Sequence, residues 1–291
     1  MEACGSAHYW GRELASLGHD VRLMPEAYVK PYVKRGKNDA VDAEANCEAV
    51  TRPTMRFVAI KSAEQQAVLM LHRTRDLLVR QRTMLINSLR GQMAEFSLIA
   101  GQGAAKVADL AERIRTAPSS SLPDAAKACA EILLSQITEL QVQIRAIEHS
   151  IMSCHRASAI SQRLETIPGV GIITATAIAA TVADARIFES DRHFAAWVGL
   201  TPRQSGSGGK VHLGKISKKG ESYLRRLLVL GATALVRYAR NRPEIALWIG
   251  GLLARRPPRV AMVAVANKLA RIAWAVMARG EDYRGGAVSV S

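Results

Sequence analysis

The pattern of hydrophobic positions predicts a mainly helical molecule that begins with a short α/β segment. Residues 7–17 have the spacing of an amphipathic helix that ends at Gly18, and residues 20–24 alternate as a strand does. Residues 56–60 are a second candidate strand or an extended segment. One or two strands are too few for an independent sheet. We therefore expect either that further strands precede Met1 in the natural gene or that this part is damaged.

Two long helical stretches follow. Residues 64–98 contain no Pro and are strongly basic, which fits either a solvated helix face or contact with nucleic acid. Residues 125–158 repeat apolar side chains at the spacing of a coiled-coil a/d seam. We expect the two stretches to form an antiparallel coiled-coil hairpin with a connector at residues 99–124, although the same seam would also suit two protomers. The arginines are Arg73, Arg75, Arg80, Arg82 and Arg90, and the seam residues are Leu133, Ile137, Leu140, Ile144, Ile147 and Ile151.

The C-terminal part begins with Ile167-Pro168-Gly169-Val170-Gly171 between two helical stretches. This is the pattern of a helix-hairpin-helix turn, in which Gly169 and Gly171 would let the backbone approach a phosphate. A tight structural turn is the alternative. Further on, residues 201–210 are rich in Ser and Gly and predict a flexible loop. The last apolar helix, residues 260–278, carries Lys268 and Arg271, which favours a buried helix over a membrane span.

The charge balance points to a polyanionic partner. The 291 residues include 40 Lys+Arg against 25 Asp+Glu, a net charge of +15. Hydrophobic residues make up 48% of the chain, which is enough for real cores, while aromatic residues make up only 5%. Base stacking is therefore not the main expected mode of binding, and contact with a nucleic-acid backbone fits better. The four cysteines are scattered, which favours reduced cytosolic thiols over a zinc site or disulfides.

An acidic pair marks the helix predicted near the N-terminus. Lys37-Asn38-Asp39-Ala40-Val41-Asp42-Ala43-Glu44-Ala45 contains neither Gly nor Pro, and it places Asp39 and Asp42 three residues apart on one helical face. Two like charges held this close repel, so a divalent metal or basic side chains must offset them. Mg²⁺ takes carboxylate oxygens and suits phosphoryl transfer on nucleic acid. A solvated helix N-terminus is the alternative, because the helix dipole favours Asp there.

A second candidate site lies on the glycine-rich loop. A serine hydroxyl on a loop surrounded by cations is what attack on a phosphodiester needs, because the cations stabilise charge in the transition state. The alternative is a plain Ser/Gly linker with solvated lysines. Together with Gly169 and Gly171, the side chains that we predict to contact nucleic acid are Arg203, Lys210, Lys215, Lys218, Lys219 and Arg225.

Several motifs, taken in order, resemble one family, the DEDD-type insertion-sequence transposases (the IS one-ten family). They include Met1-Glu2-Ala3-Cys4, the Asp39 motif, Ile167–Gly171, Gly199-Leu200-Thr201-Pro202, Ser207-Gly208-Gly209-Lys210 and Ile216-Ser217-Lys218-Lys219-Gly220. The resemblance implies a partial RNase H-like (RuvC-like) domain at residues 1–62. It also implies coiled-coil helices at residues 63–160 and a mainly helical transposase domain at residues 161–291.

The resemblance also implies catalytic residues. The family has an Asp, Glu, Asp, Asp tetrad that holds Mg²⁺; Glu2 matches its Glu, and Asp39 and Asp42 match its last two Asp residues. The family's serine matches Ser207, with Ser205 as the weaker candidate. No residue matches the first Asp, which in the family lies on the opening strand. We therefore expect an N-terminally truncated copy, or a start codon assigned too late, and impaired catalysis.

The resemblance implies a transposase that cuts and rejoins DNA, guided by a structured RNA, as a dimer or tetramer in the bacterial cytoplasm near the nucleoid, with no membrane partner. Two other functions fit the same residues. One is a non-catalytic remnant that still binds nucleic acid, and the other is a RuvC-like junction nuclease that uses only the carboxylates.

Overall fold

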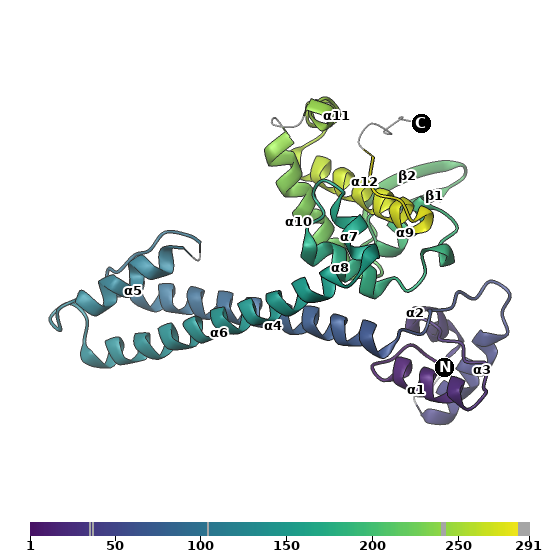
Figure 1. Cartoon of the computed structure of the whole chain (residues 1–291), viewed down its shortest axis with the longest axis horizontal. Coiled ribbons are helices and arrows are strands. Elements are labelled where there is room, and N and C mark those ends of the chain that lie inside the picture. The colour runs from purple at the N-terminus through teal and green to yellow at the C-terminus, as the bar shows by residue number, and fades with distance from the viewer. Residues whose placement is uncertain (35, 37, 104, 240–242, 285–291) are drawn as a thin grey trace. The chain divides into compact units, whose positions relative to one another are not determined.

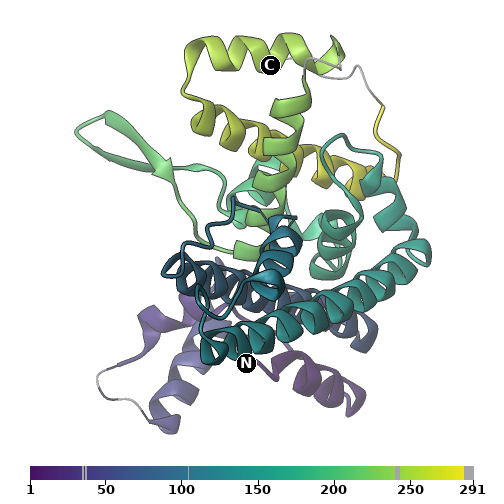
Figure 2. The ribbon, with the colours of Figure 1, turned by 90° about the vertical axis from the view of Figure 1, so that its left-hand side faces the viewer.

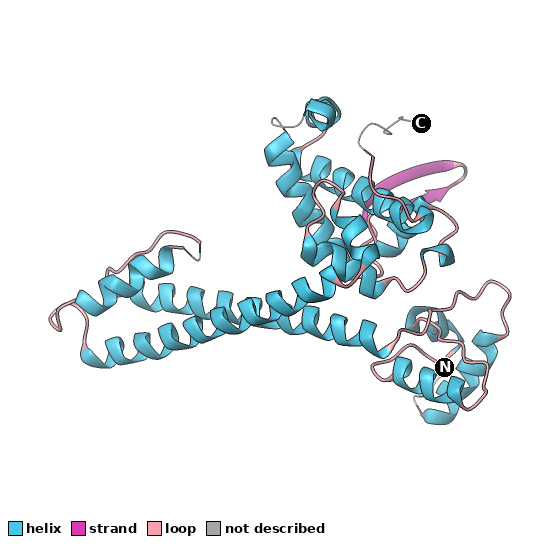
Figure 3. Ribbon diagram, viewed as in Figure 1, coloured by secondary structure: helices cyan, strands magenta, loops and turns pink. Residues whose placement is uncertain are grey.

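The computed structural model of the chain is mostly helical (Figures 1 and 3). It describes residues 1–284 except 35, 37, 104 and 240–242, so Lys37 of the acidic motif lies outside the described residues. The chain divides into two compact units, which we describe separately. One comprises Met1–Leu69 and His155–Ser291, and the other, the middle unit, comprises Met70–Cys154.

The N-terminal segment has less strand structure than the pattern of residues 20–24 and 56–60 predicted. Its elements are α1 (Ala7–Ser16), α2 (Glu26–Val29), the 3₁₀ turn η1 (Lys30–Tyr32) and α3 (Asp39–Val50). In place of the two predicted strands, isolated bridges join Glu2 to Met24 and Leu23 to Val58. The strand prediction was wrong in extent for residues 20–24, while residues 56–60 agree with the alternative of an extended segment. Each segment makes only a few backbone hydrogen bonds to a neighbour and no continuous ladder.

The predicted helix start at the acidic motif is confirmed. Asn38 is the N-cap of α3, and its side-chain oxygen accepts a hydrogen bond from the Val41 N–H at 2.8 Å. Ala45 and Ala49 of α3 are fully buried against Met24 and Val29. This small apolar contact holds α3 and leaves its first turn at the surface.

The middle unit contains most of two long helices, α4 (Ala63–Ala94) and α6 (Asp124–Arg156), which run side by side in opposite directions (Figures 1 and 2). Arg75 donates to Glu148, and Arg82 donates to Gln141. From the first pair to the second, the residue number rises by seven on α4 and falls by seven on α6. This is the relation that an antiparallel heptad register requires. Three of the predicted seam residues are buried, namely Ile137, Ile144 and Ile151. The assignment as a coiled coil stays a prediction.

The connector predicted between these helices contains a third helix, α5 (Lys106–Thr116). Its buried residues, Val107, Leu110, Ala111 and Ile114, follow the i, i+3, i+4, i+7 pattern of an amphipathic helix. The sequence pattern predicted only a connector here and did not predict this helix. Glycines and prolines lie on both sides of α5. Because α5 is short, these flanking residues dominated the sequence pattern, and its apolar stripe was not recognised as a helix.

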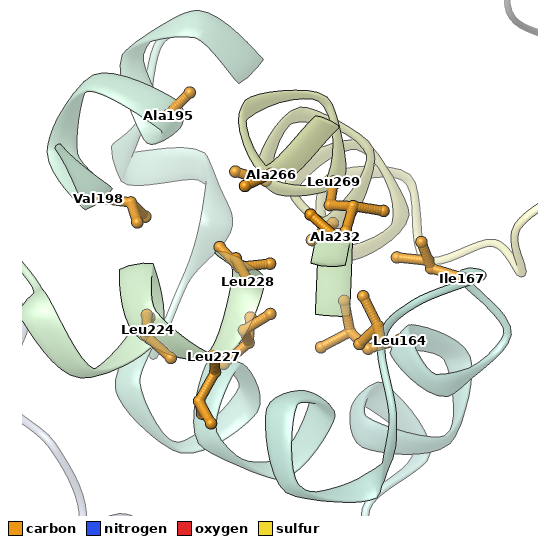
Figure 4. Close-up of a cluster of buried hydrophobic side chains, with 14 of the residues drawn as sticks. Leu164, Ile167, Ala195, Val198, Leu224, Leu227, Leu228, Ala232, Ala266 and Leu269 are labelled. Atoms are coloured by element: carbon orange, nitrogen blue, oxygen red, sulfur yellow. The ribbon is translucent and has the colours of Figure 1, made fainter. Parts of the chain in front are cut away.

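The C-terminal part folds around a helical core. Its elements are α7 (Ala159–Glu165), α8 (Ile172–Thr181), the 3₁₀ turn η2 (Ala185–Ile187), α9 (Asp191–Val198), β1 (Pro202–Ser207), β2 (Lys210–Ile216), α10 (Ser222–Tyr238), α11 (Pro243–Arg255) and α12 (Pro258–Arg279). Leucines of α10 and small residues of α12 meet the ends of α7 and α9 (Figure 4). Close helix contact follows from the many Ala side chains, such as Ala232 and Ala266, both fully buried.

Helix α12 packs in this core, as the charged residues within it predicted. It is the one described helix that is long and apolar enough to cross a membrane by length and composition alone. However, Val265, Leu269 and Val276 are buried against the other helices. The Lys268 ammonium lies 4.2 Å from the centre of the Trp248 ring, and burial, followed by the nearby Arg271 charge, lowers the pKa of Lys268.

The turn between α7 and α8 owes one of its glycines to packing. Gly169 has a φ of +87°, and its carbonyl oxygen lies against α10, where a Cβ on Gly231 would come within 2.0 Å of it. This contact gives Gly169 a structural role. Gly171 is the N-cap of α8 and is exposed. A Cβ added at this position would have no heavy atom within 4 Å.

A second pair of glycines fixes the segment between α9 and α10. Gly199 is the left-handed C-cap of α9, with a φ of +80°, and a Cβ there would lie 2.1 Å from the Lys219 oxygen. Gly220 has a φ of +81°, and a Cβ there would lie 1.9 Å from the Trp197 oxygen. The two turns therefore touch backbone to backbone, and neither position has room for a side chain.

Replacing Gly220 by Ala should destabilise the C-terminal helices. The substitution adds both left-handed strain and a clash with the Trp197 carbonyl, so we expect the free energy of unfolding to fall by about 3 kcal/mol. Urea denaturation followed by circular dichroism measures the change. Gly250→Ala is the matched control, because a Cβ at that position in α11 meets no atom within 4 Å. Equal denaturation midpoints for the two variants would contradict the packing argument.

Candidate functional site

Residues 201–216, predicted as a flexible loop up to residue 210, form a two-stranded antiparallel ribbon instead. Strand β1 pairs with β2 from Ser207–Lys210 at the tip to Pro202–Ile216 at the base. All residues of β1 and all but Ile216 of β2 are exposed, and Figure 2 shows the ribbon extending away from α10 and α12. The loop prediction was wrong. It was based on the Ser and Gly content, whereas the dipeptide Gly208-Gly209 is typical of a two-residue hairpin turn.

The tip of the ribbon is a tight two-residue turn. Gly208 has a φ of +58° and Gly209 a φ of +79°, and positive φ at both central positions is what a type I′ hairpin turn requires. Ser207 and Lys210 flank this turn and are direct cross-strand partners. Side chains of such partners lie on the same face of the ribbon. The register therefore puts the Ser207 and Lys210 side chains on one face of the ribbon at its exposed tip.

The register also separates the ribbon into two chemically different faces. Ser205 pairs with His212, two positions from the tip pair, so these side chains share the face of Ser207 and Lys210. The opposite face carries Val211 and Leu213, whose exposed fractions are 64% and 67%. We call the first surface, made by Ser205, Ser207, Lys210 and His212, the polar face. No sequence motif indicated His212, and the register of the two strands assigns it to this face.

Backbone contacts and two arginines hold the base of the ribbon. The Ser217 N–H donates to the Thr201 oxygen at 2.8 Å, and the Arg203 guanidinium donates to the Ser217 oxygen at 3.3 Å. Arg225 of α10 donates through Nη1 to the oxygens of Val198 at 2.8 Å and Lys219 at 3.3 Å. Arg203 and Arg225 thus have structural partners, and their predicted nucleic-acid contacts stay predictions.

The predicted lysines are differently placed. Lys210, Lys215, Lys218 and Lys219 are all exposed, and none forms an ion pair with a described residue. The acidic residue in this basic stretch, Glu221, is the N-cap of α10, and its carboxylate accepts from the Tyr223 N–H at 3.1 Å. The ribbon and the turn after it therefore present positive charge that the described part of the protein does not neutralise.

The acidic pair lies in the first turn of α3. The two later carboxylates of this helix are in ion pairs, Glu44 with Lys34 and Glu48 with Arg52, and the hydrogen bond to Glu44 raises the pKa of Lys34. Asp39 and Asp42 form no such pair with a described residue. Asp39 is exposed and Asp42 is half-buried. Both carboxylates are therefore accessible to a cation from solution.

Glu2 lies on an extended segment whose backbone pairs with Met24. Within residues 1–284, apart from the gaps given above, no three His, Cys, Asp or Glu side chains are grouped so that they could hold a metal ion. The structure therefore does not unite Glu2 with Asp39 and Asp42, and their common site stays a prediction. The Asp pair alone suits Mg²⁺, which often keeps several waters and takes one or two carboxylates together with substrate phosphates.

Two family models match the chain. A model of DEDD transposases of the IS110 type matches residues 1–97, and the model described as transposase IS116/IS110/IS902 family matches residues 161–246. The ribbon lies within the second match and the acidic pair within the first. Both candidate sites thus fall in segments that resemble known transposase domains.

Curated relatives extend the similarity to nearly the whole chain. A "Probable family 20 transposase" from Pseudomonas aeruginosa is 50% identical over 98% of this chain and 85% of its own length. The transposase for insertion sequence element IS1111A from Coxiella burnetii is 40% identical over 99% of this chain and 79% of its own. A pilin gene-inverting protein from Moraxella bovis is 28% identical over 50% of this chain and 45% of its own.

Replacing Arg225 by Met should loosen the base of the ribbon. The variant keeps the length of the side chain but leaves the carbonyls of Val198 and Lys219 without their donor, which should cost about 2 kcal/mol of folding stability. Arg192→Met, which removes the same charge from an exposed residue of α9 that forms no ion pair with a described residue, should cost less than half as much. Thermal melting of both variants tests this. If Arg225→Met instead weakened nucleic-acid binding with no change in melting, the structural role of Arg225 would be refuted.

Proposed function

The chain belongs to the IS116/IS110/IS902 family of transposases, and from that premise we propose that it cuts and rejoins DNA strands through a serine on the β1–β2 ribbon. Membership makes it a DNA-processing enzyme of transposition. The observation that carries the finer proposal is the register of the ribbon. It supports Ser207 as the reacting group, because it places Ser207 and Lys210 as cross-strand partners on one face of an exposed tip.

The chemistry follows from what the polar face offers. The Ser207 oxygen gives up its proton and forms a bond to phosphorus, while the bond from phosphorus to the leaving strand's oxygen breaks and that oxygen takes up a proton. Lys210 and the lysines after the ribbon stabilise the negative charge that builds on the phosphate. Attack of a strand hydroxyl on the protein–DNA bond reverses the step and rejoins the DNA, with the number of phosphodiester bonds conserved.

Rejoining distinguishes this proposal from a simple nuclease. The Moraxella relative is named for inverting a pilin gene, an outcome that requires cut strands to be joined again. A covalent intermediate on serine stores the energy of the broken bond, whereas hydrolysis directed by carboxylates alone loses it to water. The similarity to that relative therefore favours a serine-linked recombinase over the junction nuclease.

The acidic pair supplies the second part of the proposal. DEDD-type transposase domains generally use divalent metal ions. We assign Asp39 and Asp42, with Glu2, to Mg²⁺, which when bound would stabilise charge on phosphate oxygens. The protein contributes the carboxylates of Asp39 and Asp42, which lie in the first turn of α3 next to its N-cap, Asn38.

The proposed partners follow from charge and family. The net charge of +15 and the unpaired lysines near the ribbon favour nucleic acid. We propose DNA as the substrate, a structured RNA as the guide, and a homo-oligomer, dimer or tetramer, as the active form. Exposed lysines that meet phosphate oxygens serve DNA and RNA alike, because they recognise the backbone and not the bases.

Replacing Ser207 by Ala should abolish strand cutting without loss of DNA binding. Cleavage of an insertion-sequence end should fall by about 10³ or more, because no other group supplies the nucleophile. The protein–DNA adduct seen on denaturing gels should disappear with it. Ser205→Ala is the matched control, since Ser205 lies two residues earlier on the same face, and it should retain the adduct.

The outcomes of this experiment separate the alternatives. Cutting that persists in Ser207→Ala would favour the carboxylate-only nuclease. Loss of the adduct only in Ser205→Ala would move the nucleophile to Ser205. Binding without cutting by the unmodified chain would favour the non-catalytic nucleic-acid-binding remnant.

Replacing Asp39 and Asp42 together by Asn should remove metal binding. We expect the affinity for Mn²⁺, used as a spectroscopic substitute for Mg²⁺, to fall by about tenfold or more, because the neutral amides offer weaker ligands. Paramagnetic titration of Mn²⁺ measures this without any need for activity. The control is Glu44→Gln on the same helix, whose carboxylate is paired with Lys34. An unchanged Mn²⁺ titration in the Asp39→Asn, Asp42→Asn variant would refute the assignment.

A further inference from the structure

The middle unit holds a cavity that no residue of the proposed reaction uses. It has a volume of about 590 Å³ and lies among α4, α5 and α6. Its floor is apolar and includes the buried side chains of Ile86, Leu134 and Ile137. Val142, at 61% exposure, extends this apolar surface outward. The cavity is therefore open and partly lined by apolar side chains, and its volume falls in the range of small-molecule sites, about 300–1,000 Å³.

Three guanidinium groups border this apolar floor, those of Arg82, Arg115 and Arg145. Arg82 donates to Gln141 through Nη1, while its Nε is buried and meets no acceptor among the described residues. Arg115 lies 3.2 Å from Glu131 and so is partly neutralised. Arg145 is exposed and forms no ion pair with a described residue. The exposed Arg145 guanidinium is therefore the donor group open to an anionic ligand, whereas the Arg82 Nε is buried, and Glu112 on the wall offsets part of the positive charge.

The combination identifies the chemistry of the ligand. Guanidinium groups bind phosphate through paired hydrogen bonds, and their planar faces stack on nucleobases. An apolar floor suits the faces of a base, whereas a free phosphate or an acidic side chain would leave that floor in contact with water. A base inside a duplex is stacked on both sides and would not reach the floor. The ligand that uses all of these groups is a single unstacked nucleotide.

We propose that this cavity receives one nucleotide of a single-stranded nucleic acid, with the base over Ile86, Leu134 and Ile137 and its phosphate at Arg82 and Arg145. This inference rests on the proposed function, which supplies nucleic acid as the partner. It adds a base-contacting site to a protein whose low aromatic content had argued against base stacking as the main mode. An aliphatic floor with arginine neighbours replaces the aromatic platform of other single-strand binders.

The test compares a short thymidine oligonucleotide with the same sugar–phosphate strand lacking bases. Both strands carry equal charge, so the ratio of their affinities for the full chain isolates the contribution of the bases. We expect the complete strand to bind about tenfold more tightly than the abasic strand. Fluorescence anisotropy at one fixed salt concentration measures both affinities.

Two variants act on the cavity in different ways. Ala108→Leu fills it from an exposed wall position without changing charge or adding an aromatic ring, and Arg145→Ala removes an exposed guanidinium. The ratio should fall toward one in Ala108→Leu, and binding of the complete strand should fall about tenfold in Arg145→Ala. Arg73→Ala, which removes an exposed arginine of α4 outside the cavity, is the charge-matched control and should keep the ratio. Circular dichroism checks that each variant is folded.

The outcomes are distinct for the cavity and for the proposed function. If the Ala108→Leu and Arg73→Ala variants gave the same ratio as the unmodified chain, the cavity would not hold a base, while nucleic-acid binding itself would stand. If the unmodified chain bound neither strand nor DNA duplex, the proposed function would fail, and this inference with it.

Discussion

The close approach of two glycine turns is the constraint on which the candidate site depends. Gly199 ends α9 and Gly220 precedes α10, and at each position a Cβ would lie within about 2 Å of a carbonyl oxygen in the opposite turn, at 2.1 and 1.9 Å. Arg225 spans both turns with hydrogen bonds to Val198 and Lys219. Since the ribbon begins and ends between these turns, their contact fixes where both of its strands emerge from the helical core.

Beyond that base, the backbone pairing between β1 and β2 holds the described residues of the ribbon together. Its strands are exposed on both faces, so the antiparallel register alone decides which side chains lie together. That register groups Ser205, Ser207, Lys210 and His212, and it leaves Val211 and Leu213 on the other side. A ribbon of this kind can enter the major groove of DNA, which admits two β-strands. In a transposase, an exposed hydroxyl on a rigidly based ribbon can reach a phosphodiester without any rearrangement of the core.

The sequence predicted those elements whose signals are local and strong. The start of α3 and the apolar α12 fall into this class, because a run of residues without Gly or Pro and a long apolar period need no partner to be recognised. The strands at residues 20–24 and 56–60 were overestimated because a strand depends on neighbours that alternation cannot supply. Helix α5 was missed because its apolar stripe is short, and the ribbon because composition was weighed above the Gly208-Gly209 turn. For the site, the sequence indicated Ser207 and Lys210, but only the register shows that they share a face with His212.

The positive charge of the chain has two different uses, which a count of residues cannot separate. Arg75 and Arg82 donate across α4 and α6, Arg90 holds the carbonyls of Gly101 and Gly103, and Arg225 joins the two glycine turns. By contrast, the lysines of the ribbon and the following turn have no ion-pair partner among the described residues. The planar fork of arginine suits fixed carbonyl and carboxylate partners, while the flexible, strongly hydrated lysine remains available to phosphate. The net charge therefore includes arginines that already have fixed partners inside the protein, and the exposed lysines near Ser207 are the ones that we propose to meet a phosphodiester.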